Sequence, residues 1–328
     1  MVCVMIPCYN EEGNIEPLYK RIAAAFSIIP DQRYCLQFID NASTDGTVAK
    51  IKTLAARDPA VRLIVNARNF GVQRSGLHGF LQAPGDAVIS MVADLQDPPE
   101  MLPQFVKYWR QGFKVVIGTK PESREHWLMF MVRRAYYRLV GQLSEVPLIE
   151  NFTGFGLYDR EVVEQVRATG DRYPYFRGLI ADLGYPRAEI PFVQPRRERG
   201  VSKNNFYTLY DLAMLGITSH SKVPLRLAAM AGFALSAISL LMAFGYLVAK
   251  LLFWNHFPAN TAPILIAVFF FASVQLFFTG ILGEYIGNIY TQVLKRPLVV
   301  EKERANCPDA EFSVSGTITN GKQVAVDA

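Results

Sequence analysis

Three polar clusters follow short apolar runs in the amino-terminal half of the chain, and their side chains could bind a nucleotide diphosphate. They occupy residues 7–12, 40–47 and 94–100, and the last of these reads DLQDPPE. Asp94 and Gln96 provide carboxylate and amide oxygens, the ligands that a hard divalent cation such as Mg2+ or Mn2+ prefers. A cation held there would bridge two phosphates and offset the charge that develops on a departing diphosphate. We therefore expect a metal site at Asp94 and Gln96.

The other two clusters suit a nucleoside, although each also has a purely structural explanation. Tyr9 offers a ring that could stack on a base, and the carboxylates of Glu11 and Asp40 could accept hydrogen bonds from base or ribose. The same clusters suit helix starts, where Asn10 or Asp45 would cap free backbone N–H groups. A D-x-Q triplet alone is also weak, because acidic turns after strands are common. The combination of the three clusters is what indicates a nucleotide site.

The elements that must position these clusters alternate between strands and helices. Short apolar runs predict strands, and stretches with a helical period lie between them. This alternation predicts an α/β fold with a mostly parallel central sheet covered on both faces. Ligands of such sheets bind beyond the carboxyl ends of the strands, which is where the polar clusters fall. The expected strands are residues 2–6, 35–39, 62–65, 87–91 and 114–118, and the expected helices are residues 11–26, 45–57, 70–82 and 99–111.

Two long apolar segments in the carboxyl-terminal half predict a membrane anchor. Residues 225–252 carry charge only on Arg226 and Lys250 near their ends, and residues 263–283 carry none. Each is long enough to cross a hydrocarbon core of about 30 Å at about 1.5 Å per residue. A buried helix of a soluble protein is the alternative, but two such segments separated by a short polar break favour a membrane hairpin. We expect transmembrane helices at about residues 225–253 and 263–287.

Charge placement predicts the orientation of this hairpin. The break at residues 255–262 contains no Lys or Arg, whereas basic residues precede the first span and follow the second. By the positive-inside rule, both flanks are then cytoplasmic. We expect a multi-pass protein of the cell membrane with a cytoplasmic catalytic domain at residues 1–222, a membrane domain at residues 223–290, and a cytoplasmic basic segment with a flexible tail at residues 291–328.

The remaining composition restricts the partners. Residues 122–143 and 204–220 predict helices that could lie in the membrane interface or pack on the domain core. The net charge of +5 is modest, and its clusters suit anionic headgroups or phosphates better than nucleic acid. The four cysteines form no disulfide or zinc pattern. We therefore expect membrane lipids as partners and no nucleic acid.

Taken together, these stretches resemble glycosyltransferase family 2, and within it the polyprenyl-phosphate glycosyltransferases. The resemblance covers about residues 2–300, and its most specific stretches are ADLQDPPE at residues 93–100 and RGVSK at residues 199–203. It implies a GT-A fold and the inverting transfer of one hexose from a nucleotide sugar to a polyprenyl phosphate at the cytoplasmic membrane face. UDP is more expected than GDP as the nucleotide. Other matching stretches are residues 6–12, 40–47, 69–71, 153–160 and 283–287.

The resemblance also implies roles for residues at matching positions. The nucleotide-binding positions are Pro7, Tyr9, Glu11, Asp40 and Asp94. The catalytic positions around the diphosphate and its Mg2+ or Mn2+ are Asp94, Gln96, Arg199 and Lys203. The acceptor-phosphate positions are Arg124, Arg134, Arg138, Ser202 and Lys203, although the first three could instead contact headgroups or solvent.

Two positions depart from the family pattern. Val92 stands where the family usually has the first acid of its metal motif, and Gly154 stands where some relatives carry an Asp viewed as the catalytic base. A phosphate monoester has a second pKa of about 6, so at neutral pH it is already largely an anionic nucleophile and needs a general base less than a sugar hydroxyl does. Positioning and electrostatic stabilisation could then carry most of the acceleration.

Two other functions compete with the enzyme. A processive polysaccharide synthase shares the fold but usually carries a Q-x-x-R-W motif and more spans, which this sequence lacks. A non-catalytic, membrane-anchored scaffold that binds nucleotide sugars would explain Val92 and Gly154, whereas the retained Asp94, Gln96 and Lys203 favour an enzyme. The resemblance also implies a homo-oligomer formed through the membrane segments, and Gly and Ala residues in the first span permit close helix contact.

Overall fold

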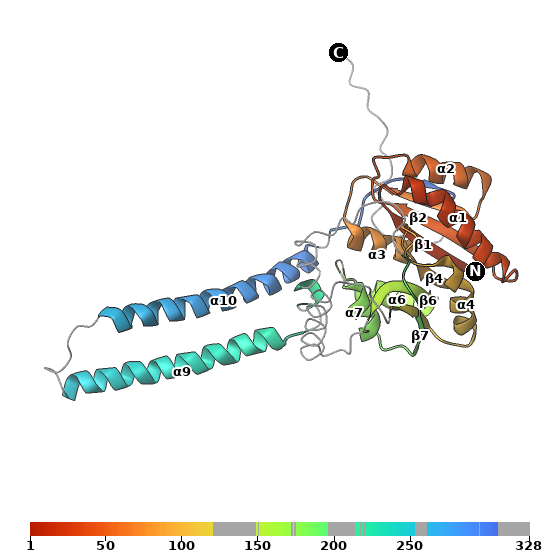
Figure 1. Ribbon diagram of the computed structural model, residues 1–328. Coiled ribbons are helices and arrows are strands. Elements are labelled where there is room, and N and C mark those ends of the chain that lie inside the picture. Colours follow the sequence, from red (N-terminus) through yellow and green to blue (C-terminus); the bar gives the residue numbers. More distant parts are fainter. Residues whose placement is uncertain are drawn as a thin grey trace, which may run out of the picture.

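The computed structural model describes residues 1–120, 149, 151–171, 173, 175–195, 214–216, 218, 221–252, 261–294 and 296–307. In this part of the chain, eight strands form one sheet in the order β7-β5-β6-β4-β1-β2-β3-β8. Helices cover both of its faces, and two long helices extend away from it (Figure 1). The expected α/β fold with a mostly parallel central sheet is therefore confirmed.

The centre of the sheet is parallel, as the sequence predicts. It consists of β1 (Val2–Cys8), β2 (Tyr34–Asp40), β3 (Val61–Asn66) and β4 (Ala87–Ser90). All neighbouring pairs among these strands run parallel, so that their carboxyl ends meet at one edge. The strands are almost entirely buried, which explains why they are continuous apolar runs rather than alternating ones.

The helices form two layers, and each layer has its own core. One layer contains α1 (Glu12–Ser27), α2 (Thr47–Arg57) and α4 (Leu102–Arg110), which follows a short 3-10 turn at Pro99–Met101. The opposite layer contains α3 (Val72–Gln82), α6 (Arg160–Thr169) and α7 (Phe176–Asp182). The four helices expected from the sequence are thus confirmed, with α3 beginning just after the sharp turn at Gly71.

The other half of the sheet is mixed and was only partly expected. It contains β5 (Val115–Thr119), β6 (Phe152–Asp159) and β7 (Arg187–Pro191), and β6 pairs antiparallel with both β4 and β5. The strand β5 is confirmed, whereas β6 and β7 were not predicted. At the opposite edge, β8 (Glu301–Ala305) pairs antiparallel with β3. The chain therefore returns to the sheet after its last long helix.

The two long apolar helices match the expected membrane hairpin. They are α9 (Val223–Leu252) and α10 (Thr261–Val293), which lie side by side (Figure 1). Each contains a stretch apolar and long enough to span a membrane, and neither stretch is buried inside the protein. Of the two helices expected to be interfacial, residues 122–143 lie outside the described residues, and of residues 204–220 only 214–216 and 218 are described, as helix.

Candidate functional site

Four loops gather at the carboxyl edge of the parallel strands. They are residues 7–12 after β1, residues 40–47 after β2, residues 66–71 after β3 and residues 91–97 after β4. The register of the strands places the ends of β1 and β2 side by side, with Cys8 opposite Asp40. The three polar clusters singled out in the sequence therefore share one edge of the sheet.

The first two loops are joined by hydrogen bonds between their backbone and side chains. The Asn10 N–H donates to Ser43 Oγ at 2.8 Å, and Asn10 Oδ1 accepts from the Thr44 N–H at 2.8 Å. The Glu11 N–H donates to Thr47 Oγ1 at 2.9 Å. The suggested capping role of Asn10 is thus replaced by contacts across the loops. These contacts fix the two loops relative to each other.

Asp40 lies beneath this pair of loops. Its carboxylate is fully buried and accepts hydrogen bonds from the backbone N–H and the hydroxyl of Ser43. Burial raises the pKa of Asp40, and the bonds from Ser43 oppose that rise. The carboxylate therefore shapes the turn, and its contact with a base or ribose stays a prediction. Tyr9 and Glu11 lie half-buried at the rim, and Glu11 Oε2 accepts from Asn14 Nδ2 at 2.6 Å.

The loop after β4 alternates between buried and outward-facing residues. Ala93 and Leu95 are buried, whereas Val92, Asp94 and Gln96 are partly exposed. Leu95 has a φ of 63°, which turns the chain so that its apolar side chain enters the core. The Gln96 N–H donates to Asp94 Oδ1 at 3.1 Å. The two expected metal ligands therefore belong to one tight turn.

The oxygen atoms of this turn fit a hard divalent cation that is shared with a substrate. Within the described part of the chain, no group of three or more His, Cys, Asp or Glu side chains could hold a metal ion on its own. Mg2+, however, is commonly held by one or two carboxylates and completed by substrate phosphates and water. Asp94 and Gln96 satisfy that pattern. Val92, with 39% of its surface exposed, occupies the same outward-facing series.

Asp97 organises this loop and was not singled out in the sequence. It is buried, and its Oδ2 accepts from the Val92 N–H at 3.0 Å, closing the loop on itself. Burial raises the pKa of Asp97 to about 7, and the charge of Asp94 adds to that rise, while the Val92 N–H and Lys120 oppose it. In the sequence, the one feature that points to a structural role for Asp97 is its place between Gln96 and two prolines.

A cavity of about 180 Å3 lies next to this loop. Its walls come from the start of α3, the loop after β4, strand β6 and the start of α7, and they include Pro7 and Asp97. Gly154 of β6 lines it with a φ of 100°, a conformation that residues with a side chain rarely adopt. Arg177 lines it too, and its Nη1 donates to the Phe152 carbonyl at 3.1 Å. Arg177 adds a cation that the sequence did not point to.

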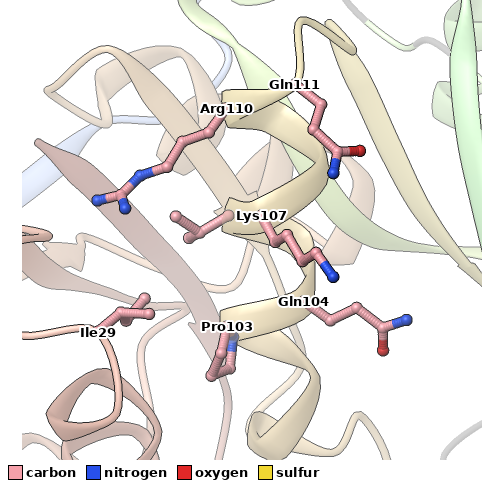
Figure 2. A pocket seen from close by; sticks show the side chains of 7 residues that line it. Ile29, Pro103, Gln104, Lys107, Arg110 and Gln111 are labelled. Carbon is pink, nitrogen blue, oxygen red and sulfur yellow. The ribbon is translucent and has the colours of Figure 1, made fainter.

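The residues expected to bind the diphosphate and the acceptor phosphate lie outside the part of the chain that the structure describes. They are Arg124, Arg134, Arg138, Arg199, Ser202 and Lys203. A wider groove of about 580 Å3 runs along α4 beside Ile29 (Figure 2). It is lined by Lys107 and Arg110 and by none of the predicted site residues that the structure describes.

Loops at the carboxyl edge, an acidic turn suited to a shared cation and an adjacent cavity define an α/β protein with a candidate ligand site at the edge of its sheet. The model of the family "Glycosyl transferase family 2" matches residues 3–167. The chain therefore belongs to glycosyltransferase family 2, and the resemblance inferred from its motifs is confirmed.

Relatives cover nearly the whole chain. A bactoprenol glucosyl transferase of Shigella phage SfII is 33% identical over 92% of this chain and 97% of its own length. An uncharacterized glycosyltransferase of Synechocystis is 31% identical over 90% of this chain and 92% of its own. Among solved structures, a mannosyltransferase of Pyrobaculum calidifontis in complex with GDP-Man and Mn2+ has a TM-score of 0.46 at 18% identity, covering 90% of this chain and 87% of that one.

Proposed function

We propose that this chain transfers a single hexose from a nucleotide sugar to a polyprenyl phosphate, with inversion at the anomeric carbon. The names of the phage relatives support a glucosyl-type transfer to bactoprenol, and the alignment with them covers 92% of this chain. The observation that carries the proposal is the joining of the nucleotide-type site to a membrane hairpin. The segment after α10 forms β8 of the same sheet whose carboxyl edge bears Asp94.

In this proposal the donor lies across the carboxyl edge of the sheet. Tyr9 and Glu11 would face its nucleoside, with Asp40 beneath them, and Asp94 and Gln96 would hold the diphosphate together with Mg2+ or Mn2+. A cation held by Asp94 and Gln96 would supply Lewis-acid stabilisation of the charge on the departing diphosphate. UDP is the expected nucleotide. Arg199, Ser202 and Lys203 close over the phosphates in this scheme, and Arg124, Arg134 and Arg138 attract the lipid phosphate.

The chemistry requires positioning more than proton transfer. An anionic oxygen of the acceptor phosphate attacks the anomeric carbon, the bond to the diphosphate breaks, and its electron pair leaves with the diphosphate. The nucleophile is already largely ionised at neutral pH, which accounts for a site with Gly154 where an acid would otherwise act as base. Arg177 provides a positive charge in the cavity, where it would orient an anionic acceptor.

The two substrates indicate where the protein lies in the cell, because the donor is soluble and the acceptor is a membrane lipid. The domain and β8 lie on the cytoplasmic side of the cell membrane, where nucleotide sugars are made, and the hairpin crosses the membrane twice. The basic flanks of α9 and α10 support this orientation. A homo-oligomer formed through the apolar helices belongs to the same proposal.

Turnover by the purified, detergent-solubilised protein tests the proposal. We would supply a panel of labelled nucleotide sugars with polyprenyl phosphate and Mg2+ or Mn2+, with and without a chelator. A labelled lipid whose formation stops on chelation is the expected result, and it would identify the sugar. Nucleotide binding without lipid product for any sugar would instead favour a scaffold, because Val92 removes one carboxylate from the metal motif.

A further inference from the structure

Two arginines lie over one aromatic ring where the domain meets the membrane hairpin, and a third follows α10. Arg68 lies with its guanidinium carbon 4.1 Å from the centre of the Phe70 ring, and Arg74 of α3 lies 5.3 Å from the same centre. Arg296 follows α10 and directly precedes Pro297, whose carbonyl accepts a hydrogen bond from Arg74. We call Arg68, Arg74 and Arg296 the arginine cluster.

The positive charges of this cluster are not balanced within the described part of the chain. Arg68 Nη1 donates to the Asn69 carbonyl at 3.0 Å, and Arg74 Nη2 donates to the Pro297 carbonyl at 2.6 Å. None of the three has a carboxylate within ion-pair distance among the described residues. Partial burial lowers the pKa of Arg74, and the neighbouring charges of Arg68 and Arg296 lower it further. Folding thus brings like charges together, and their repulsion costs free energy. A bound anion would offset this repulsion.

The nearby carboxylate on β8 does not neutralise the cluster, because it has other partners. Glu301 Oε1 lies 2.6 Å from His78 Nε2, and the Glu301 carboxylate also accepts from Arg304. The carbonyl bonds use one nitrogen of Arg68 and one of Arg74, and each guanidinium carries five N–H donors, so donors remain for an anion. Arg68 and Arg296 are exposed to solvent.

The position of the cluster points to the membrane surface. The apolar stretch of α10 ends at Val293, shortly before Arg296. In Figure 1, α3 lies on the side of the domain that faces the end of α10. Headgroups begin where the apolar part of a membrane helix ends, and arginine forms bidentate hydrogen bonds with phosphate.

We propose that the arginine cluster binds the phosphate of an anionic phospholipid headgroup and thereby docks the domain on the bilayer. This inference goes beyond the proposed transfer reaction. The cluster is separate from the cavity beside Asp97, since none of its three arginines lines that cavity. Successive side chains on a helix diverge, so Gln73 lines the cavity while Arg74 reaches the segment after α10.

Thermal unfolding in lipid nanodiscs tests the headgroup site without measuring turnover, so that failure of the proposed reaction would not affect it. The full chain is placed in phosphatidylcholine discs with increasing phosphatidylglycerol. The test variant is Arg68→Gln with Arg296→Gln, and Arg296→Gln alone serves if the double variant does not fold. The control is Arg33→Gln with Lys107→Gln, which removes the same charge from side chains that have no carboxylate partner among the described residues and do not belong to the cluster. Lys107 lies on α4 (Figure 2).

The expected result is a rise in Tm with phosphatidylglycerol for the wild type and the control, and loss of at least half of that rise in the test variant. An equal loss of the Tm rise in the test and control variants would show a general effect of charge and would contradict a specific headgroup site. An equal rise with inorganic phosphate in neutral discs would make it a site for free phosphate. A rise with polyprenyl phosphate and none with phosphatidylglycerol would make it an acceptor site, and would also overturn the proposal.

Discussion

Asp94 is the carboxylate on which the proposed metal chemistry depends. It is partly exposed, belongs to a tight turn and leaves no core cavity when altered. We expect Asp94→Asn to lower turnover by about 100-fold or more, because a charged ligand of the bridging cation contributes several kcal/mol to the transition state. The apparent Tm should change little, as expected for a partly exposed side chain. Steady-state rates with Mg2+ and Mn2+, beside melting curves, measure both.

A matched control for this variant lies in the same stretch. Glu100 is exposed and forms an ion pair with Arg21 at 2.8 Å, away from the turn. Glu100→Gln removes the same charge from the chain, so near wild-type turnover is expected. Similar losses in both variants would mean that net charge, and not metal ligation, explains the effect of Asp94.

Val92 offers the reverse experiment, a gain of metal affinity. Its side chain is partly exposed in the same outward-facing series as Asp94 and Gln96. An acid at this position would add a third oxygen ligand, so we expect Val92→Asp to lower the Mg2+ concentration for half-maximal activity by about tenfold. A titration of activity with Mg2+ measures this. An unchanged midpoint would show that residue 92 does not face the cation.

Gly154 combines a positive φ with a place in the cavity wall. A Cβ there would meet only Phe176 Cδ1, at 3.9 Å, so the difficulty is backbone conformation and not space. We expect Gly154→Ala to cost about 1–3 kcal/mol and to lower the apparent Tm. Gly76 of α3 lines the same cavity with no atom within 4 Å of its Cβ position and no positive φ. Gly76→Ala should therefore leave the Tm nearly unchanged, and an equal loss would contradict the backbone argument.

At the scale of elements, β8 follows the membrane hairpin in the chain and forms side-chain contacts with two different helices of the domain. Glu301 pairs with His78 of α3, whereas Glu303 pairs with Lys52 of α2 at 2.7 Å. Hydrogen bonds and charges from His78 and Arg304 outweigh burial and lower the pKa of Glu301 to about 2. A lowered pKa in the folded state means that this carboxylate stabilises the fold above its ordinary pKa of about 4.5 and stops doing so as the pH falls towards 2.

The pH dependence of stability tests this contact. We expect Glu301→Gln to lower the Tm at neutral pH by an amount equivalent to about 1–3 kcal/mol, and the difference from wild type to shrink as the pH falls from about 4.5 to about 2. Melting curves of the detergent-solubilised protein across this range measure it. Glu303→Gln, whose ion pair is more exposed, should have a smaller effect. A pH-independent effect at residue 301 would contradict the assignment.

The local sequence pattern predicts those strands whose own residues are apolar, but not a strand that forms only through tertiary contacts. Strands β1 to β5 are apolar runs that the helix layers bury on both faces of the sheet, so composition alone predicts them. Strand β8 has the sequence EKERA, which carries no strand propensity and pairs only because α10 returns it to the edge of β3. The same holds at the candidate site: Asp94 follows an apolar strand, so its place at the edge of the sheet was predictable, whereas Arg177 reaches the cavity only through tertiary packing.

At the scale of the whole molecule, the arrangement of the hairpin determines which of its ends lies on the same side of a membrane as the sheet. Tyr285 OH near the end of α10 donates to the Ser221 carbonyl just before α9 at 2.6 Å, and Asn288 Nδ2 donates to Thr218 Oγ1 at 3.2 Å. The start of α9 and the end of α10 are therefore neighbours, as in any antiparallel hairpin. If the hairpin spans the bilayer, the site and β8 share one side, and the start of α10 lies on the other.

Labelling of single cysteines distinguishes the two orientations. Cys3, Cys8 and Cys35 are buried, so a Cys307→Ser chain provides a background with little labelling. With the domain in the cytoplasm, an impermeant maleimide added to intact cells should modify Thr261→Cys at the start of α10, and should modify Lys302→Cys of β8 only after permeabilisation. Lys302 is exposed, so burial would not hide it. Modification of residue 302 in intact cells would place the site outside, where nucleotide sugars are not made, and with it the proposed reaction would fail.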